Sequence, residues 1–230
     1  MKFEFSPSAR INAEHIGREA QPVIIIDDAF HGAQALVDLA TRVQFTPIGP
    51  YYPGIRAQID KTFTQSLSDA IQPYLHVHLG IKKPTWIGDC FFSMVTRRPE
   101  DLTPIQRLPH YDGIEENRIA IVYFLCDAKH GGTAYYRHLS SGFETISAER
   151  FGGYKDLLES EIHESGLPPP RYIGDGAPLF ARTKVFDAAF NRMLIYRGSI
   201  LHCSATESMP TFSADPEVGR LTINAFLNPI

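Results

Sequence analysis

His110 and Asp112 are the residues of this chain whose types and spacing are best suited to holding a metal ion. Residues two apart on a β-strand point to the same face, so an imidazole and a carboxylate would project side by side. A second histidine would complete the 2-His-1-carboxylate set that holds non-haem Fe(II). A His-X-Asp pair also arises by chance in a chain with nine histidines, so the interpretation depends on whether suitable partners occur later in the chain.

Suitable partners do occur, close to the C-terminus. His202 lies in an apolar segment and is the candidate for the second histidine. Beyond it, Arg220 and Thr222 open the last predicted strand, where their spacing places them on one face. A guanidinium and a hydroxyl on one face suit the binding of a carboxylate.

Each of these residues also has a purely structural interpretation. His110 could be a loop histidine bonded to Asp112, and His202 could be a core histidine. Cys203 is expected to pack on the face opposite His202. Arg192 and Arg197 could also bind a carboxylate, but as strand-end residues they are expected at the surface or in ion pairs. His15, His31, His130 and His163 are expected at the surface.

The N-terminal part of the chain, residues 1–85, is predicted to supply a strand and helices that pack on the core. Pro22–Asp28 reads as a strand buried on both faces, because four β-branched residues follow one another. Helices are predicted at Gly32–Val43 and Thr64–Leu79 from their apolar spacing. Residues 1–21 are expected to be mostly irregular, with a short strand at Phe3–Phe5. Pro47–Gly54 is a proline-rich loop that could line an active-site mouth.

The remaining part, residues 86–230, is predicted to be rich in strands. The predicted strands are Trp86–Arg97, Ile105–Asp112, Arg118–Cys126, Gly132–His138, Leu179–Phe186, Asn191–Arg197, Ile200–Cys203 and Gly219–Leu227. A helix is inserted at 149–165 and ends before three prolines. The fold class is therefore mainly β (α+β): a double-stranded β-helix, or jelly roll, of about eight antiparallel strands in a single domain.

Composition narrows the class of protein. The 230 residues carry a net charge of −4, so no basic surface for nucleic acid or an anionic membrane is expected. The three cysteines form no Cys-X-X-Cys pair, which argues against a zinc site or a disulfide framework. No apolar run is long enough to span a bilayer, and no signal peptide is evident, so a cytoplasmic protein is expected.

Four short motifs, taken in order, resemble those of the 2-oxoglutarate- and Fe(II)-dependent dioxygenases, most closely the prolyl-hydroxylase-like branch. The motifs are His110-X-Asp112, Gly131–Tyr136, the Asn191-Arg192 approach to His202, and Arg220-X-Thr222. The resemblance covers roughly residues 86–230, and the strand-helix lead-in at 22–40 is also similar. Two departures stand out. Glu207–Val218 looks like an inserted loop, and Phe124 stands where relatives often have a tyrosine that contacts 2-oxoglutarate.

The resemblance implies a role for each residue. His110, Asp112 and His202 would hold Fe(II), and Arg220 with Thr222 would bind the distal carboxylate of the co-substrate 2-oxoglutarate. Independently of the resemblance, alternation along Gly132–His138 would place Ala134, Tyr136 and His138 on one face, where Tyr136 and His138 could line the pocket. Phe124 is a further candidate for lining it. O2 would then be used to hydroxylate a C–H bond, with release of succinate and CO2. Because Asp112 leaves no vacancy for a halide ligand, hydroxylation is favoured over halogenation.

The substrate implied by this resemblance is peptidyl or a small molecule, and neither nucleic acid nor a membrane is an expected partner. Two other functions remain open. One is a cupin-like Fe(II) dioxygenase that does not use 2-oxoglutarate, in which Arg220 would be structural. The other is a non-catalytic jelly-roll binding protein that does not depend on Fe(II). The sequence does not indicate an oligomeric state.

Overall fold

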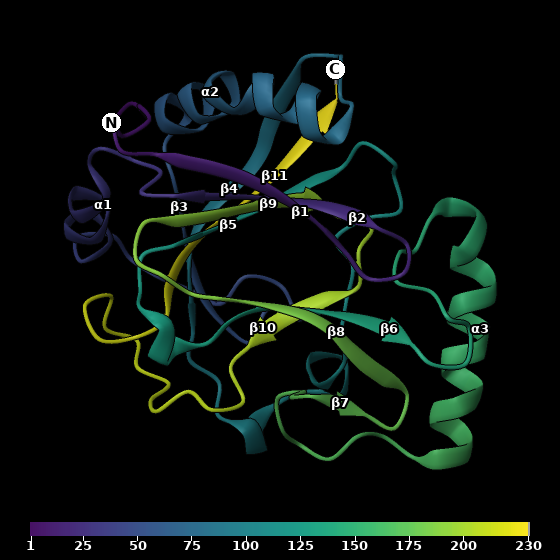
Figure 1. Ribbon diagram of the computed structural model, residues 1–230. Coiled ribbons are helices and arrows are strands. Elements are labelled where there is room, and N and C mark those ends of the chain that lie inside the picture. The colour runs from purple at the N-terminus through teal and green to yellow at the C-terminus, as the bar shows by residue number, and fades with distance from the viewer. Residues whose placement is uncertain (230) are drawn as a thin grey trace.

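Two antiparallel β-sheets packed face to face form the centre of the molecule, as the computed structural model shows for residues 1–229 (Figure 1). In chain order the strands are β1 (Arg10–Ile16), β2 (Gln21–Asp27), β3 (Gly54–Gln58), β4 (Thr85–Val95), β5 (Ile119–Phe124), β6 (Gly132–His138), β7 (Gly176–Ala177), β8 (Phe180–Asp187), β9 (Arg192–Arg197), β10 (His202–Ala205) and β11 (Leu221–Pro229). The helices are α1 (Ala33–Ala40), α2 (Lys61–Leu79) and α3 (Ala148–Ser165), with three short 3₁₀ turns, η1 (Pro99–Asp101), η2 (Pro104–Arg107) and η3 (Ala128–His130).

The larger sheet has seven strands in the order β1-β2-β9-β5-β11-β4-β3. Its outer face is covered by α1 and α2, and its inner face packs on the smaller sheet (Figure 1). Strand β2 shows how the apolar side chains of one strand pack on both faces of this sheet. Ile24 and Ile26 contact the helix side, whereas Val23 and Ile25 lie between the sheets. The prediction of a strand buried on both faces is confirmed.

The smaller sheet has four strands in the order β10-β6-β8-β7. Helix α3 runs along its outer side (Figure 1), and the helix and the sheet bury a third apolar cluster between them. Tyr154 is the one fully buried residue of α3, and Leu158 and Ile162 pack beside it, so this helix presents a narrow apolar stripe. The mainly β, jelly-roll-like architecture predicted from the sequence is confirmed.

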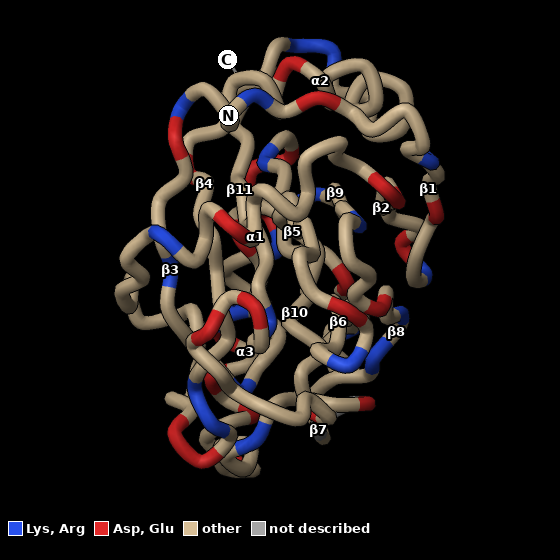
Figure 2. Tube along the Cα trace, turned by 90° about the vertical axis from the view of Figure 1, so that its left-hand side faces the viewer, with Lys and Arg blue, Asp and Glu red and all other residues tan. Residues whose placement is uncertain are grey.

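The helix boundaries follow from local chemistry. The Asp60 side chain accepts a hydrogen bond from the Phe63 N–H and caps the start of α2, three residues before the predicted start. The helix ends where Gly80 adopts a left-handed conformation with a φ of 69°. No helix within residues 1–229 is long and apolar enough to cross a bilayer. Positions with Lys or Arg and with Asp or Glu are interspersed along the trace (Figure 2).

Three parts of the sequence prediction were wrong. Residues 10–16, expected to be irregular, form edge strand β1, and Phe3–Phe5 contributes only an isolated bridge from Phe5 to Phe30. Strand β3 was not predicted. Ile105–Asp112 is not a strand, because Pro104 starts a 3₁₀ turn and Thr103 and Gln106 cap it reciprocally.

Candidate metal centre

The three predicted metal ligands lie together at one end of the space between the sheets. One ligand atom from each of His110, Asp112 and His202 falls within 4.8 Å of the other two. Nε2 of His202 is 3.3 Å from Oδ2 of Asp112, and Nε2 of His110 is 3.7 Å from Oδ1 of the same carboxylate. Atoms on one face of an octahedral ion are about 3 Å apart for bonds of about 2.1 Å, so small side-chain shifts would bring all three onto one ion.

The backbone holds this cluster without help from the side chains. His110 and His202 form an isolated antiparallel bridge, although residues 109–112 do not form a strand. The Asp112 N–H donates to the Gly198 carbonyl at 2.7 Å, just beyond the end of β9. A Cβ on Gly198 would lie 3.3 Å from the Asp112 Cβ, which is tighter than usual, so glycine suits this approach.

The His202 ring is fixed in one tautomer. Its Nδ1 lies 2.8 Å from the Ile200 carbonyl oxygen, which can only accept, so Nδ1 carries the hydrogen. Nε2 is then the atom that faces Asp112 and is free to bind a metal. A ligating histidine whose other nitrogen donates to a backbone carbonyl is the usual arrangement in metal sites. The ring also packs edge-on against Tyr196, with ring centres 4.9 Å apart.

The electrostatics of the cluster suit a cation. Burial alone would raise the pKa of Asp112, but the charge of His202, its hydrogen bond, and the charges of His110 and Arg118 hold that pKa below its usual range. Burial likewise opposes charge on His202, yet Asp112 raises the pKa of that imidazole. For His110, partial loss of hydration and repulsion from His202 lower the pKa. The lowered pKa values of Asp112 and His110 favour a carboxylate and a neutral imidazole, the forms in which these side chains bind a metal.

Arg220 and Thr222 lie deeper between the sheets. Arg220 is 2% exposed and precedes β11, and its Nη2 donates to the Gly132 carbonyl of the smaller sheet at 2.8 Å. Its Nε is buried and has no hydrogen-bond partner among residues 1–229. The Thr222 hydroxyl lies 3.2 Å from the Ser93 carbonyl and 2.8 Å from Oδ1 of Asn224. A buried guanidinium with an unsatisfied donor suits an anionic ligand.

The other predicted pocket residues separate into two groups. Phe124 is fully buried between the sheets, opposite Thr222 in the register, and the Arg220 guanidinium carbon is 5.6 Å from its ring centre. Tyr136 and His138 instead lie on the outer face of the smaller sheet. The Tyr136 hydroxyl donates to the Gly174 carbonyl at 2.9 Å, and His138 Nε2 bonds to Glu161 of α3 at 2.7 Å. The prediction that these two side chains line the pocket was wrong, because β6 directs Tyr135 inward instead.

Sequence reasoning missed a group of polar residues beside Arg220. Tyr52, Arg56 and Ser93 each have a buried side-chain oxygen or nitrogen without a partner. Arg56, Ser93, Thr222 and Phe124 follow one another across β3, β4, β11 and β5 in register. Of Tyr52, Arg56 and Ser93, only Tyr52 had a signal in the sequence, because it lies in the proline-rich loop that could line an active-site mouth. Arg56 lies in a short strand with no pattern of its own.

Other sequence expectations concern histidines and Cys203. Cys203 packs on the outer face with the α3 layer, as predicted. His130, expected at the surface, is 4% exposed. Its two ring nitrogens bond to Asp127 at 2.9 Å and to the Val218 carbonyl at 2.8 Å, so it fastens the Glu207–Val218 loop to the turn before β6.

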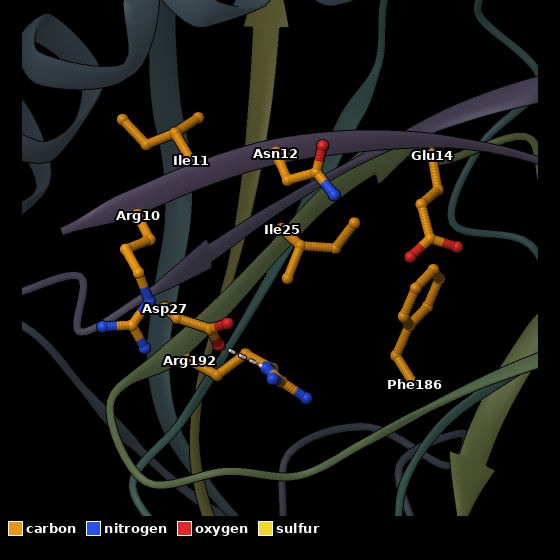
Figure 3. Close-up of a pocket in the computed structure, with 8 residues that line it drawn as sticks. All are labelled: Arg10, Ile11, Asn12, Glu14, Ile25, Asp27, Phe186 and Arg192. Carbon is orange, nitrogen blue, oxygen red and sulfur yellow. Dashed lines mark hydrogen bonds and ion pairs between the residues drawn. The ribbon is translucent and has the colours of Figure 1, made fainter.

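A surface hollow of about 240 Å³ lies elsewhere, on β1, β2 and β9 beside Phe186 (Figure 3). The charged residues that line it are paired with opposite charges: Arg192 bonds to Asp27, Arg10 to Asp28, and Glu14 to Lys184. The expectation that Arg192 is ion-paired is confirmed. Within residues 1–229, the charged residues lining this hollow are thus paired, whereas Arg56 and Arg220 each keep a buried Nε without a partner.

The fold and the cluster together define a two-sheet jelly roll with a His-Asp-His site between its sheets. The solved structures similar to it include HygX from Streptomyces hygroscopicus with nickel and 2-oxoglutarate bound, at 10% identity, a TM-score of 0.52, and coverage of 92% of this chain and 84% of that one. HygX with nickel, 2-oxoglutarate and hygromycin B bound matches at 10% identity and a TM-score of 0.50, covering 92% and 83%.

Residues 7–227 match a family model described as a family of unknown function (DUF6445), and the chain belongs to that family. No curated protein sequence matches it. At 10% identity the likeness to HygX shows a shared fold.

Proposed function

We propose that this protein is an Fe(II)- and 2-oxoglutarate-dependent oxygenase that hydroxylates a C–H bond of a small-molecule or peptidyl substrate, with release of succinate and CO2. The observation that carries the proposal is the joint presence of the His110–Asp112–His202 cluster and the buried Arg220, whose Nε lacks a partner, between the same two sheets. HygX, which shares the fold, has been solved with nickel and 2-oxoglutarate bound.

The residues present fit the cofactors. Two imidazoles and one carboxylate are the donor set that non-haem Fe(II) prefers, whereas thiolates would favour zinc or a cluster. The unsatisfied polar atoms of Arg220, Tyr52 and Ser93 suit the carboxylate of 2-oxoglutarate. When bound, Fe(II) and 2-oxoglutarate would supply electrons that reduce and so activate O2, which is the oxidant of the C–H bond.

The chain's own residues would hold and orient these groups. His202 would keep its Nδ1 hydrogen on the Ile200 carbonyl and offer Nε2, the ring nitrogen nearest Asp112, to the metal. Arg220, held in place by the hydrogen bond from Nη2 to the Gly132 carbonyl, would offer its unpartnered Nε–H to the carboxylate. Apolar walls from Phe124 and Tyr196 would keep water from the reacting groups.

Anaerobic visible absorption of the metal-free protein, on adding Fe(II) and then 2-oxoglutarate, tests the proposal. A metal-to-ligand charge-transfer band is expected in the wild type. His202→Ala should abolish it, and Arg220→Met should raise the 2-oxoglutarate concentration needed for half of it by at least about tenfold. His76→Ala and Arg42→Met, at exposed positions, are the matched controls and should change nothing.

The alternatives make different predictions in the same titration. A folded, iron-loaded protein without the band would indicate a cupin-like dioxygenase that does not use 2-oxoglutarate. A folded protein that binds no iron would indicate a non-catalytic jelly roll. Circular dichroism of each variant separates loss of the site from loss of the fold.

A further inference from the structure

We propose that the substrate carries a carboxylate and that Arg56 binds it beside the metal centre. This inference rests on the proposed function and adds a substrate class to it. Arg56 lies on β3, an edge strand of the larger sheet, and directly opposite Ser93 of β4. It belongs to none of the four motifs that resemble those of the dioxygenases.

The side chain of Arg56 is held in place by aromatic rings. Its guanidinium carbon lies 4.1 Å from the Tyr52 ring centre and 5.5 Å from that of Phe91. Stacking of this kind fixes the plane of a guanidinium while its N–H groups stay free for a ligand. The aromatic contacts therefore orient the arginine without using its hydrogen-bonding capacity.

The Arg56 side chain forms no ion pair or hydrogen bond within residues 1–229, and its Nε is buried. Loss of hydration lowers the pKa of Arg56, and the charges of Tyr52, Asp112 and Asp89 act against that shift. Asp112 would be committed to the metal in the loaded protein. The exposed Asp89 would still act on this half-buried cation, and a ligand that supplies an anion directly beside it would stabilise it further.

A count of charges in the loaded site leads to the same conclusion. Fe(II) and Arg220 together carry three positive charges, and Asp112 and the two carboxylates of 2-oxoglutarate carry three negative ones. Arg56 is left over. Arg118, whose charge lowers the pKa of Asp112, adds a further positive charge nearby and is bonded only to Asn228. The loaded centre is thus electropositive and suited to an anionic substrate.

The positions of Arg56 and Arg220 in the larger sheet assign them to different ligands. Arg220 is almost completely buried and leads into β11, in the middle of the sheet. Arg56 is partly exposed and follows the Pro47–Gly54 loop at the sheet edge. A co-substrate that binds first and deepest suits Arg220, and a substrate that arrives afterwards from outside suits Arg56. A guanidinium fork matches a carboxylate with two parallel hydrogen bonds.

Matched acids and amides test this proposal. The probes are N-acetyl-leucine, N-acetyl-proline and hippurate, each against its primary amide. Binding is read from the shift of the charge-transfer band in the anaerobic Fe(II)–2-oxoglutarate complex and from thermal unfolding of the metal-free protein. The wild type should bind at least one acid ten or more times more tightly than its amide. Arg56→Met should remove that preference, and Arg56→Lys should keep part of it.

Three results would overturn the inference. The first is an equal response, or no response, to acid and amide in all three pairs. The second is an acid preference that survives in Arg56→Met or is lost only in Arg118→Met. The third is a tenfold weaker response of Arg56→Met to 2-oxoglutarate itself, which would assign Arg56 to the co-substrate. Arg42→Met is the control for loss of one positive charge. Absence of the band in the wild type would instead contradict the proposed function, and the unfolding measurement would still report on Arg56.

Discussion

His110 and His202 each donate a backbone N–H to the other's carbonyl, at 2.9 and 2.8 Å, and this two-bond bridge joins segments that are far apart in sequence. Their rings lie on the same side of the bridge with centres 4.5 Å apart. The backbone therefore brings the two imidazoles together whatever their side chains bind. Metal affinity and fold stability should respond separately to changes here.

His110→Ala is expected to remove metal binding and leave the fold intact. The bridge needs only the backbone, and the His110 side chain is half exposed, so the free energy of unfolding should change by less than about 1 kcal/mol. Fe(II) affinity, measured by anaerobic calorimetry, should fall by more than about 100-fold, beyond the usual effect of losing an outer-shell partner. Unchanged affinity would remove His110 from the site; His76→Ala is the control.

Asn191→Ala should destabilise the protein by about 3 kcal/mol, because three hydrogen bonds and a left-handed conformation depend on this residue. Asn191 has a φ of 65°. Its Oδ1 accepts from the Phe30 N–H at 2.9 Å and from the buried Tyr123 hydroxyl at 2.7 Å, and its Nδ2 donates to the Phe30 carbonyl. Chemical denaturation measures the loss. Asn191→Gly also loses the three hydrogen bonds but tolerates the left-handed backbone, so it should destabilise the protein less than Asn191→Ala. Equal stability of the wild type and both variants would contradict this account.

Gly131→Ala should cost more than about 3 kcal/mol or prevent folding. Gly131 has a φ of 85°, and an added Cβ would lie 1.8 Å from the Ala205 carbonyl oxygen, which belongs to the backbone and cannot swing aside. Gly153→Ala provides the opposite case. It lies within α3 with open space around it, so alanine should raise stability by about 0.5–1 kcal/mol. Thermal and urea unfolding of both variants would show whether the signs differ.

Glu144 predicts a pH dependence of stability. Burial would raise the pKa of this carboxyl, but the N–H groups of Glu19 and Arg18 and the Arg137 guanidinium outweigh that effect and lower it below 4.5. A carboxyl whose pKa is lower in the folded than in the unfolded protein stabilises the fold at pH values above its unfolded pKa. This stabilisation is lost as the pH falls through its folded pKa. Unfolding free energy should thus decline below about pH 4.5, and Glu144→Gln should flatten that decline at a cost of about 1–3 kcal/mol at pH 7. A slope that is the same in Glu144→Gln and the wild type would contradict the assignment; exposed Glu100→Gln is the control.

Most of the strands and helices were predictable because their signals are local. Gly132–His138 was predicted with the observed bounds, and the inserted helix was predicted to within one residue. The clustering of His110, Asp112 and His202 was predictable because His110 and Asp112 are close in sequence and His202 comes later, in the order typical of the family that they resemble. The motif around Gly131 also has a local cause, since that position needs a positive φ.

The missed features depend on tertiary structure. Arg56 joins the site only because β3 pairs with β4, and a five-residue strand carries too little pattern to predict that pairing. Tyr136 and His138 were assigned to the inner face from alternation alone. Alternation groups residues by face but does not say which face is inner. The strand expected at 105–112 did not form because Pro104, just before it, and Pro109, within it, favour turns over pairing.

The place of β11 has a consequence for how the polypeptide is made. This strand lies between β4 and β5, and it is synthesised after both of them. A ribosome-bound chain that has reached β10 would expose two long apolar strand edges with unpaired backbone groups. Such edges are templates for pairing with other chains. Chaperone binding, or rapid arrival of the residues that carry Arg220 and Thr222, would then govern the yield of native protein in the cell.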